Sequence, residues 1–200
     1  FMPNAAPVPE RRALPASPPA PPRPKFDFST ASVDTSLFPY SSWARLNREV
    51  VYSSPELLQR GDMQGDWELR RALCEFLSQY RGVRCSPEQI VVGAGMEYLT
   101  GLLVQLFDRG AVFAVEDPGY ASMVDTLRIN GRGIVFIPPD ERGMRADLLE
   151  KSGADAAYIT PSHQFPLGMT MPASRRAQLL QWAASAPGRY VIEDDYDSEF

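Results

Sequence analysis

Residues 112–137 read VFAVEDPGYASMVDTLRINGRGIVFI and contain one complete strand–helix–strand unit. Two short apolar runs, 112–115 and 134–137, flank a stretch over 121–130 in which apolar residues recur at helical spacing. Short apolar runs bounded by turn residues are typical of buried strands, and a helix between them suits a crossover between parallel strands. This stretch therefore predicts a βαβ unit.

The same alternation extends over most of the chain. Further strands are predicted at 90–92, 156–159 and 190–192, and further helices at 66–80, 96–107, 145–151 and 174–186. Strands that alternate with helices at this spacing indicate an α/β fold, with a mainly parallel sheet and helices on both of its faces.

The first 25 residues have a different composition. They hold nine of the 19 prolines and carry a net charge of +3, whereas the whole chain carries −5. Such a segment cannot build a core and is expected to be an extended linker after another domain, although a frayed terminus would look similar. Residues 26–60 are expected to form an N-terminal segment, in which 37–60 mix aromatics with short helical pieces, and 61–200 are expected to form the core of the α/β domain.

Composition excludes several classes of function. The acidic balance argues against this part of the chain gripping nucleic acid itself. No run is long and apolar enough for a membrane span, so no membrane partner is expected. Cys74 and Cys85 match no zinc spacing and the chain has one histidine, so no metal site is expected. Free thiols favour the cytoplasm.

A glycine-rich turn joins the predicted strand at 90–92 to the next helix. Gly93-Ala94-Gly95 lets backbone N–H groups converge at a helix N-terminus, which favours a phosphate, although a simple tight turn would look the same. A dinucleotide fold is the competing interpretation. Tyr98 stands where that fingerprint needs a small residue for close helix–strand contact, which disfavours NAD.

Other strand ends carry aromatic and acidic side chains. Tyr120 follows the Pro118-Gly119 turn and could stack on a flat ring, or could be a core tyrosine. Asp194 and Tyr196 follow the last strand. His163 lies in a proline-rich loop, where a backbone contact and a cofactor contact both remain open. A phosphate cradle, an aromatic plate and a carboxylate together suit pyridoxal 5'-phosphate, whose pyridine nitrogen a carboxylate keeps protonated.

At this point the sequence resembles the aminotransferase-like domain of MocR/GabR-type transcriptional regulators, a branch of the GntR superfamily built on the fold-type I pyridoxal-phosphate scaffold. The resemblance covers Phe26 to Phe200 and rests on five motifs: Leu37-Phe38-Pro39 with Trp43, Gly61-Asp62-x-Gln64-Gly65 with Leu69-Arg70, Glu116–Tyr120, Thr160–Gly168 and Glu193–Phe200. It implies that the linker follows a winged-helix domain outside this chain, which would bind DNA, and that the protein is a homodimer.

The resemblance also assigns roles to the candidate residues. Asp194 would pair with the pyridine nitrogen, Tyr196 would contact the ring's phenolic oxygen, and Tyr120 would stack on the ring. Gly95, with Ala94 and Met96, would hold the phosphate, and His163 or Gln164 would supply a ring-oxygen contact. That contact comes from an asparagine in aminotransferases, whereas this chain has Phe165. The Schiff-base lysine would lie beyond residue 200, because neither Lys25 nor Lys151 is suitably placed.

Two functions follow from the resemblance. In the first, the domain senses an amine or amino acid through external aldimine formation and biases attached DNA-binding domains, with weak or incidental turnover. In the second, it belongs to a free-standing aminotransferase acting on an amino acid. The proline-rich linker and the Glu193–Phe200 ending favour the regulator.

Overall fold

The computed structural model describes residues 25–26 and 34–197, so the expected linker lies outside the described residues apart from Lys25. Two compact units divide the chain, Phe1–Gln59 and Arg60–Phe200. Each is considered by itself.

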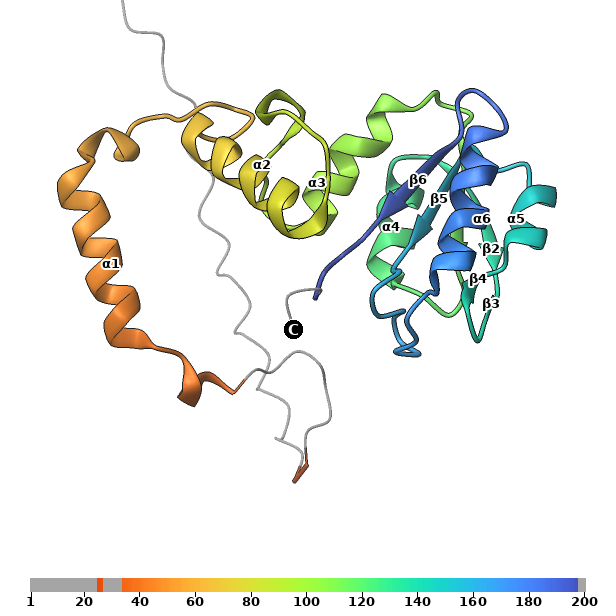
Figure 1. Cartoon of the computed structure of the whole chain (residues 1–200), viewed down its shortest axis with the longest axis horizontal. Helices are drawn as coiled ribbons and strands as arrows, with labels where there is room; N and C mark the ends of the chain where they lie inside the picture. The colour runs from red at the N-terminus through yellow and green to blue at the C-terminus, as the bar shows by residue number, and fades with distance from the viewer. Residues whose placement is uncertain (1–24, 27–33, 198–200) are drawn as a thin grey trace, which may run out of the picture. The chain divides into compact units, whose positions relative to one another are not determined.

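The first unit is built around one long helix. The short 3-10 helices η1 (Thr35–Leu37) and η2 (Pro55–Leu58) flank α1 (Tyr40–Ser53), which has 14 residues (Figure 1). An Arg45–Glu49 ion pair of 2.8 Å supports α1 at the favourable i, i+4 spacing. The predicted short helical pieces are present as η1 and η2, whereas α1 is longer than predicted. None of the residues of α1 is buried.

The second unit holds the parallel sheet. Its strands are β1 (Val112–Glu116), β2 (Gly133–Ile137), β5 (Ala156–Ile159) and β6 (Tyr190–Glu193), in the order β2-β1-β5-β6. Every neighbouring pair in this sheet is parallel. The predicted fold class, an α/β fold with a mainly parallel sheet, is confirmed.

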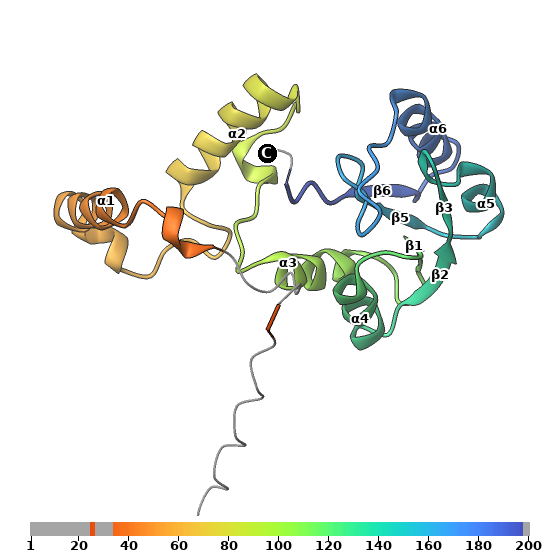
Figure 2. The ribbon, with the colours of Figure 1, turned by 90° about the horizontal axis from the view of Figure 1, so that it is seen from below.

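Helices cover both faces of the sheet, as predicted (Figure 2). One face packs against the short η4 (Val104–Leu106) and α4 (Ala121–Ile129), and α3 (Met96–Leu103) packs beside α4. The other packs against α5 (Ala146–Lys151) and α6 (Ala173–Ala184). Because β1 and β5 are buried from both sides, their residues are almost entirely apolar.

The remaining elements flank this core. They are α2 (Trp67–Arg81), η3 (Pro87–Gln89) and the two-stranded hairpin of β3 (Pro139–Asp140) and β4 (Gly143–Met144). Among the helices that the structure describes, none has the length and apolar character to cross a membrane.

The predicted strand at 90–92 is absent. The backbone there is extended but bonds elsewhere: the Nε2 atom of Gln64 donates to the Ile90 carbonyl at 3.0 Å, and the Val92 N–H donates to the Gln64 carbonyl at 2.9 Å. A segment whose backbone groups pair with a single glutamine, rather than with a neighbouring strand, forms no ladder. The prediction was wrong because a three-residue apolar run does not specify its partner.

The strand order determines where a ligand can bind. From β1 the chain passes to β2 on one side, whereas β5 and β6 follow on the other side of β1. The direction in which the chain adds strands to the sheet therefore reverses between β1 and β5. In open α/β sheets, ligands bind at such a switch point, beyond the carboxyl ends of the strands.

Candidate functional site

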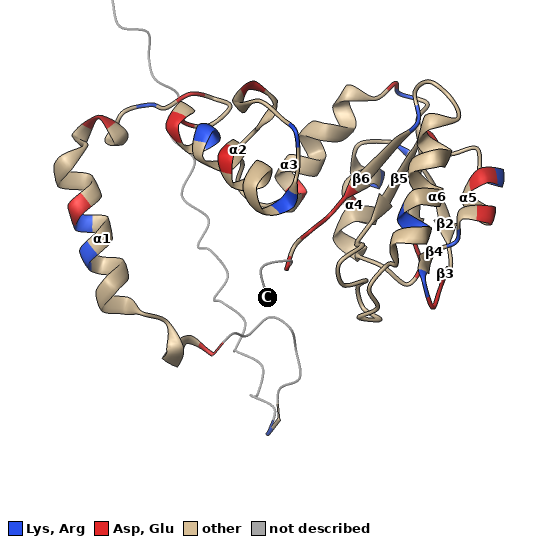
Figure 3. Cartoon of the chain, in the orientation of Figure 1, with Lys and Arg blue, Asp and Glu red and all other residues tan. Residues whose placement is uncertain are grey.

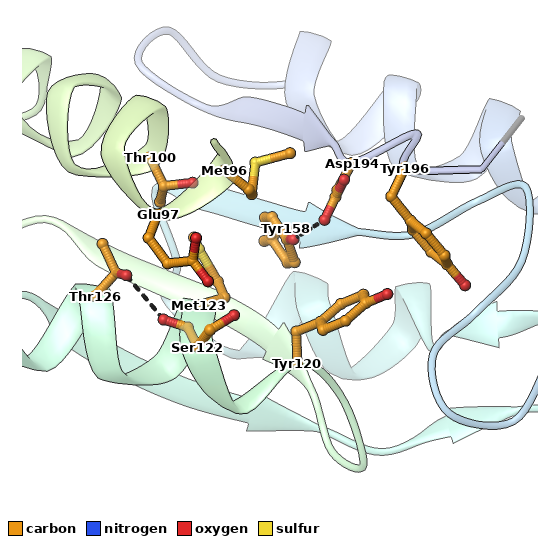
Figure 4. Close-up of a pocket in the computed structure, with 10 residues that line it drawn as sticks. All are labelled: Met96, Glu97, Thr100, Tyr120, Ser122, Met123, Thr126, Tyr158, Asp194 and Tyr196. Carbon is orange, nitrogen blue, oxygen red and sulfur yellow. Dashed lines mark hydrogen bonds between the residues drawn. The ribbon is translucent and has the colours of Figure 1, made fainter. Parts of the chain in front are cut away.

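A pocket lies at this switch point, where helix N-termini and strand ends meet (Figure 4). Its lining comes from α3, from the start of α4, from β5 and from the segment after β6. The lining residues are Met96, Glu97, Thr100, Tyr120, Ser122, Met123, Thr126, Tyr158, Asp194 and Tyr196. Four of the residues selected from the sequence, Met96, Tyr120, Asp194 and Tyr196, are thus brought together.

Asp194 is the buried carboxylate of the pocket, with 5% of its surface exposed. Its backbone N–H extends the β5–β6 pairing by donating to the Ile159 carbonyl at 2.9 Å. Its Oδ2 accepts a hydrogen bond from the Tyr158 hydroxyl, while its Oδ1 is buried and has no partner among the described residues. Burial raises the pKa of Asp194; the Tyr158 bond opposes this, and the nearby Asp195 and Asp197 add to it.

Tyr158 is one of the six lining residues that sequence reasoning missed, and it is the one that bonds to Asp194. It lies in the middle of an apolar strand, where a tyrosine is expected to be part of the core. The register of β5 against β6 would have indicated that Tyr158 lies beside Asp194. Tyr158 pairs with Ile192, and side chains two apart on a strand share a face, so Asp194 lies on the same side. Burial, and then the bond to Asp194, raise the pKa of Tyr158 far above its ordinary value.

Tyr120 presents an aromatic ring beside this carboxylate. It caps α4, and its ring stacks on Phe165 with centroids 4.2 Å apart and planes 10° from parallel. Tyr196 meets Tyr120 edge-on at 5.4 Å and donates its hydroxyl to the His163 carbonyl at 3.1 Å. Since Phe165 does not line the pocket, it covers one face of Tyr120 and leaves the other for a ligand.

The glycine turn before α3 has the geometry of an anion cradle. Gly95 caps α3 with φ +96°, a conformation that favours glycine, and its backbone precedes the N–H groups that have no partner within the helix. Met96 lines the pocket, whereas Ala94 and Gly95 do not. The carboxylate of Glu97 also faces the pocket, which places a negative charge beside this helix end (Figure 4).

His163 does not line the pocket. Its Nδ1 lies 2.9 Å from Oδ2 of Asp197, so the ring is engaged with the acidic segment, and its carbonyl serves Tyr196. The ring therefore bonds to an aspartate side chain and not to the backbone, and its contact with a cofactor stays a prediction.

Acidic residues continue from the end of β6 into the segment that follows it (Figure 3), and two of them, Asp195 and Asp197, bond to protein groups outside the pocket. Asp195 accepts from the Ser162 hydroxyl at 2.6 Å and pairs with Arg81 at 3.2 Å. Asp197 bonds to His163. Asp194 is the acid of this segment that reaches the pocket.

The loop that carries His163 and Phe165 is anchored from behind by a buried pair. The Nε2 atom of Gln164 donates to the Pro118 carbonyl at 2.9 Å and approaches Oε2 of Glu116 at 3.4 Å, while its Oε1 accepts from the Leu167 N–H. Glu116 ends β1 and is 6% exposed, and burial raises its pKa. Gln164 therefore supports the loop instead of facing the pocket.

These residues fit a phosphorylated pyridine. The unpaired oxygen of Asp194 can accept from a protonated ring nitrogen, the free face of Tyr120 can take the ring, and the α3 N-terminus can take the phosphate. Among residues 25–26 and 34–197, no cluster of His, Cys, Asp and Glu side chains could hold a metal ion. Lys151 ends α5, which packs on the opposite face of the sheet, and it does not line the pocket.

Comparison with known families agrees with this chemistry. The family described as aminotransferase class I and II matches residues 24–196. The chain belongs to this family.

Transcriptional regulators are among its relatives. This chain is 41% identical over 175 residues to the uncharacterized HTH-type transcriptional regulator YdeL of Bacillus subtilis, and the matched region covers 87% of this chain and 38% of YdeL. It is 36% identical to the HTH-type pyridoxine biosynthesis transcriptional regulator PdxR of Corynebacterium glutamicum, over 89% of this chain and 38% of PdxR. The resemblance to MocR-type regulators is confirmed, and the chain spans about two fifths of the length of these relatives.

Solved aminotransferases share the fold. An archaeal alanine:glyoxylate aminotransferase superposes with a TM-score of 0.74 and 32% identity, over 80% of this chain and 42% of the enzyme. LysN, the α-aminoadipate aminotransferase of Thermus thermophilus, gives a TM-score of 0.70 and 28% identity, over 80% and 41%. The LysN structure contains N-(5'-phosphopyridoxyl)-L-leucine. The cofactor expected from the sequence, pyridoxal phosphate, is therefore supported by the family.

Proposed function

We propose that this chain is the first part of the effector-sensing domain of a pyridoxal-phosphate-dependent transcriptional regulator. The observation that carries the proposal is the buried Asp194 carboxylate, which lines a pocket at the switch point of the sheet and has one oxygen without a partner among the described residues. A carboxylate desolvated without a partner is costly, and a cationic ring nitrogen would offset that cost.

Each candidate residue has one task in this proposal. Asp194 keeps the pyridine nitrogen protonated, which makes the cofactor an electron sink, and Tyr120 holds the ring through its free face. Tyr196 lines the pocket next to Tyr120, within reach of a ring substituent. Met96, with the backbone of Ala94 and Gly95, receives the phosphate. The Schiff-base lysine is expected outside residues 1–200.

The relatives of this chain favour a regulator over a free-standing aminotransferase. YdeL and PdxR are HTH-type regulators and are more similar in sequence to this chain than LysN is. We infer that DNA is bound by a domain outside this chain and that an amine or amino acid is the effector. The effector changes the population of a DNA-binding conformation through its differential affinity for the two states. A DNA-binding protein with free thiols at Cys74 and Cys85 suits the cytoplasm.

A homodimer is also part of the proposal. Trp43, Leu46 and Val50 recur along α1 at helical spacing and are exposed, which suits an apolar contact with a partner subunit. Light scattering of the complete protein should give twice the subunit mass. A monomer at micromolar concentration would contradict this part.

The two functions are separated by one experiment on the complete protein. Pyridoxal phosphate is added, a panel of amines and amino acids is screened by absorbance, and binding to the DNA upstream of the protein's own coding sequence is measured by fluorescence anisotropy. A regulator changes its DNA affinity with one of the amines and transfers no amino group to 2-oxoglutarate at a comparable concentration. Steady transamination without any DNA binding would favour the enzyme.

A further inference from the structure

Tyr158 bonds to Asp194 in a way that goes beyond core packing. Tyr158 lies on β5 and Asp194 directly follows β6, the neighbouring strand, on the same face of the sheet; Figure 4 shows the tyrosine hydroxyl directed at the carboxylate. Tyr158 is 6% exposed, so its hydroxyl needs a protein partner. Asp194 supplies that partner through Oδ2.

This bond determines which oxygen of Asp194 remains for a ligand. A carboxylate with both oxygens free can rotate about its bond to Cβ, and either oxygen can then face the pocket. With Oδ2 held by Tyr158 and the backbone held by the Ile159 carbonyl, Oδ1 is fixed as the unpaired acceptor. A ligand that binds at Oδ1 then loses less conformational freedom.

We propose that Tyr158 is a positioning residue that aims Oδ1 of Asp194 at the ring nitrogen of the cofactor and keeps the carboxylate ionised, an inference that rests on the proposed function. The hydroxyl acts through Asp194 and does not itself have to touch the ring. A hydrogen bond to a charged group contributes more than one between neutral groups, so its loss should be measurable.

The ionisation of Asp194 depends on its surroundings. The titratable groups around it are Tyr158 on β5, Tyr120 before α4, Glu97 on α3, and Asp195, Tyr196 and Asp197 on its own segment. Of these, the Tyr158 bond lowers the pKa of Asp194, whereas burial and the two other aspartates raise it. Removing the hydroxyl should therefore let the carboxyl take up a proton at a higher pH.

The test uses the complete protein and the affinity for pyridoxal phosphate, measured by absorbance titration between pH 5 and pH 9. Tyr158→Phe removes only the hydroxyl. It is expected to weaken binding about tenfold at pH 8. On acidification, binding should also begin to weaken at a higher pH than in the wild type. Tyr190→Phe is the matched control, because Tyr190 is an exposed strand tyrosine outside the pocket, and it should change neither quantity.

A purely structural role for Tyr158 predicts different results. It would lower the thermal stability of the cofactor-free protein without moving the pH profile, and a uniform loss of affinity at every pH would overturn the proposal. A double-mutant cycle gives a second, independent test, because Asp194→Asn provides a background without a carboxylate to position. There, adding Tyr158→Phe should change affinity less than about twofold, and a larger change would also overturn the proposal. If the wild-type protein binds no pyridoxal phosphate at all, the proposed function fails as well.

Discussion

Tyr120 and Phe165 stack with ring centroids 4.2 Å apart and planes 10° from parallel. Phe165 stands where the resemblance to aminotransferases leads one to expect an asparagine. A phenylalanine cannot offer the ring-oxygen contact of that amide, but it supports the tyrosine from the side away from the pocket. The exchange thus replaces a hydrogen bond to a ligand with a preorganised aromatic surface for it.

Phe165→Ala should remove this support. The half-buried ring is worth about 1–2 kcal/mol of unfolding free energy, and Tyr120 gains freedom that a bound ring must then remove. We expect lower thermal stability and severalfold weaker pyridoxal-phosphate binding in the complete protein. Phe165→Tyr, which keeps the stacking, should retain both. Equal affinity in the alanine variant would show that Tyr120 needs no support.

Glu116 should make stability dependent on pH. Burial raises its pKa above the ordinary value of 4.5, so the folded protein favours the protonated form. Its contribution is complete below that ordinary value and is lost as the pH rises through the raised pKa. A tenfold difference in proton affinity between the folded and unfolded chain corresponds to about 1.4 kcal/mol of unfolding free energy.

The isosteric variant Glu116→Gln cannot ionise, so its unfolding temperature should fall less than that of the wild type between pH 5 and pH 8. Glu141→Gln, in the exposed turn between β3 and β4, is the control and should follow the wild type. Parallel curves for Glu116→Gln and the wild type would mean that the buried glutamate is not protonated in this range.

The strands of the central sheet could be predicted because their apolar runs specify burial on both faces. The runs around 112–115, 134–137, 156–159 and 190–192 all became strands within one residue at either end. The run at 90–92 did not, because the partner of its backbone is Gln64, which lies 26 residues before Ile90. Local pattern shows that a segment is extended, and only tertiary pairing makes it a strand.

The candidate site could be predicted in part for a similar reason. Asp194, Tyr196 and Tyr120 follow strand ends, and open α/β sheets bind their ligands at this edge. Polar and aromatic side chains at that edge therefore indicate a binding site. Tyr158 looks like core, and only strand register brings it beside Asp194. Gln164 was considered for a ring contact, yet its amide is used by Pro118 and Leu167. Sequence identifies the polar groups of a loop but not which way each one points.

Arg70 links the loop of the Gly61–Arg70 motif to the segment around Pro87 through its guanidinium. It is 4% exposed, and its guanidinium donates to the Gly65 carbonyl at 2.8 Å, to the Pro87 carbonyl at 3.1 Å and to Asp62 at 3.1 Å. Arg70→Lys cannot keep three such bonds and should cost about 2–3 kcal/mol of unfolding free energy in urea. Arg71→Lys is the neighbouring control, because its ion pairs with Glu68 and Glu75 are exposed, and it should be close to neutral.

Glu97 should oppose the binding of a phosphate at the α3 N-terminus. Its carboxylate lines the same pocket, and like charges in a partly desolvated site repel. Glu97→Gln in the complete protein is expected to strengthen pyridoxal-phosphate binding severalfold at low salt, with a smaller gain at high salt. Glu75→Gln, an exposed change on α2, should have no effect. Weaker binding in Glu97→Gln would mean that the carboxylate contacts the ligand favourably.

Gly95 and Gly101 provide a matched pair within one helical segment. Gly95 caps α3 with φ +96°, whereas Gly101 lies inside α3 with open space where a Cβ would be. Gly95→Ala should therefore cost about 1–2 kcal/mol of unfolding free energy and weaken binding of pyridoxal phosphate, because a strained cap moves the N–H groups that would hold the phosphate. Gly101→Ala should stabilise the protein by about 0.5–1 kcal/mol and leave binding unchanged. Urea unfolding and absorbance titration of the complete protein measure the two effects. If both substitutions behave alike, the conformation of Gly95 has no special part in the site.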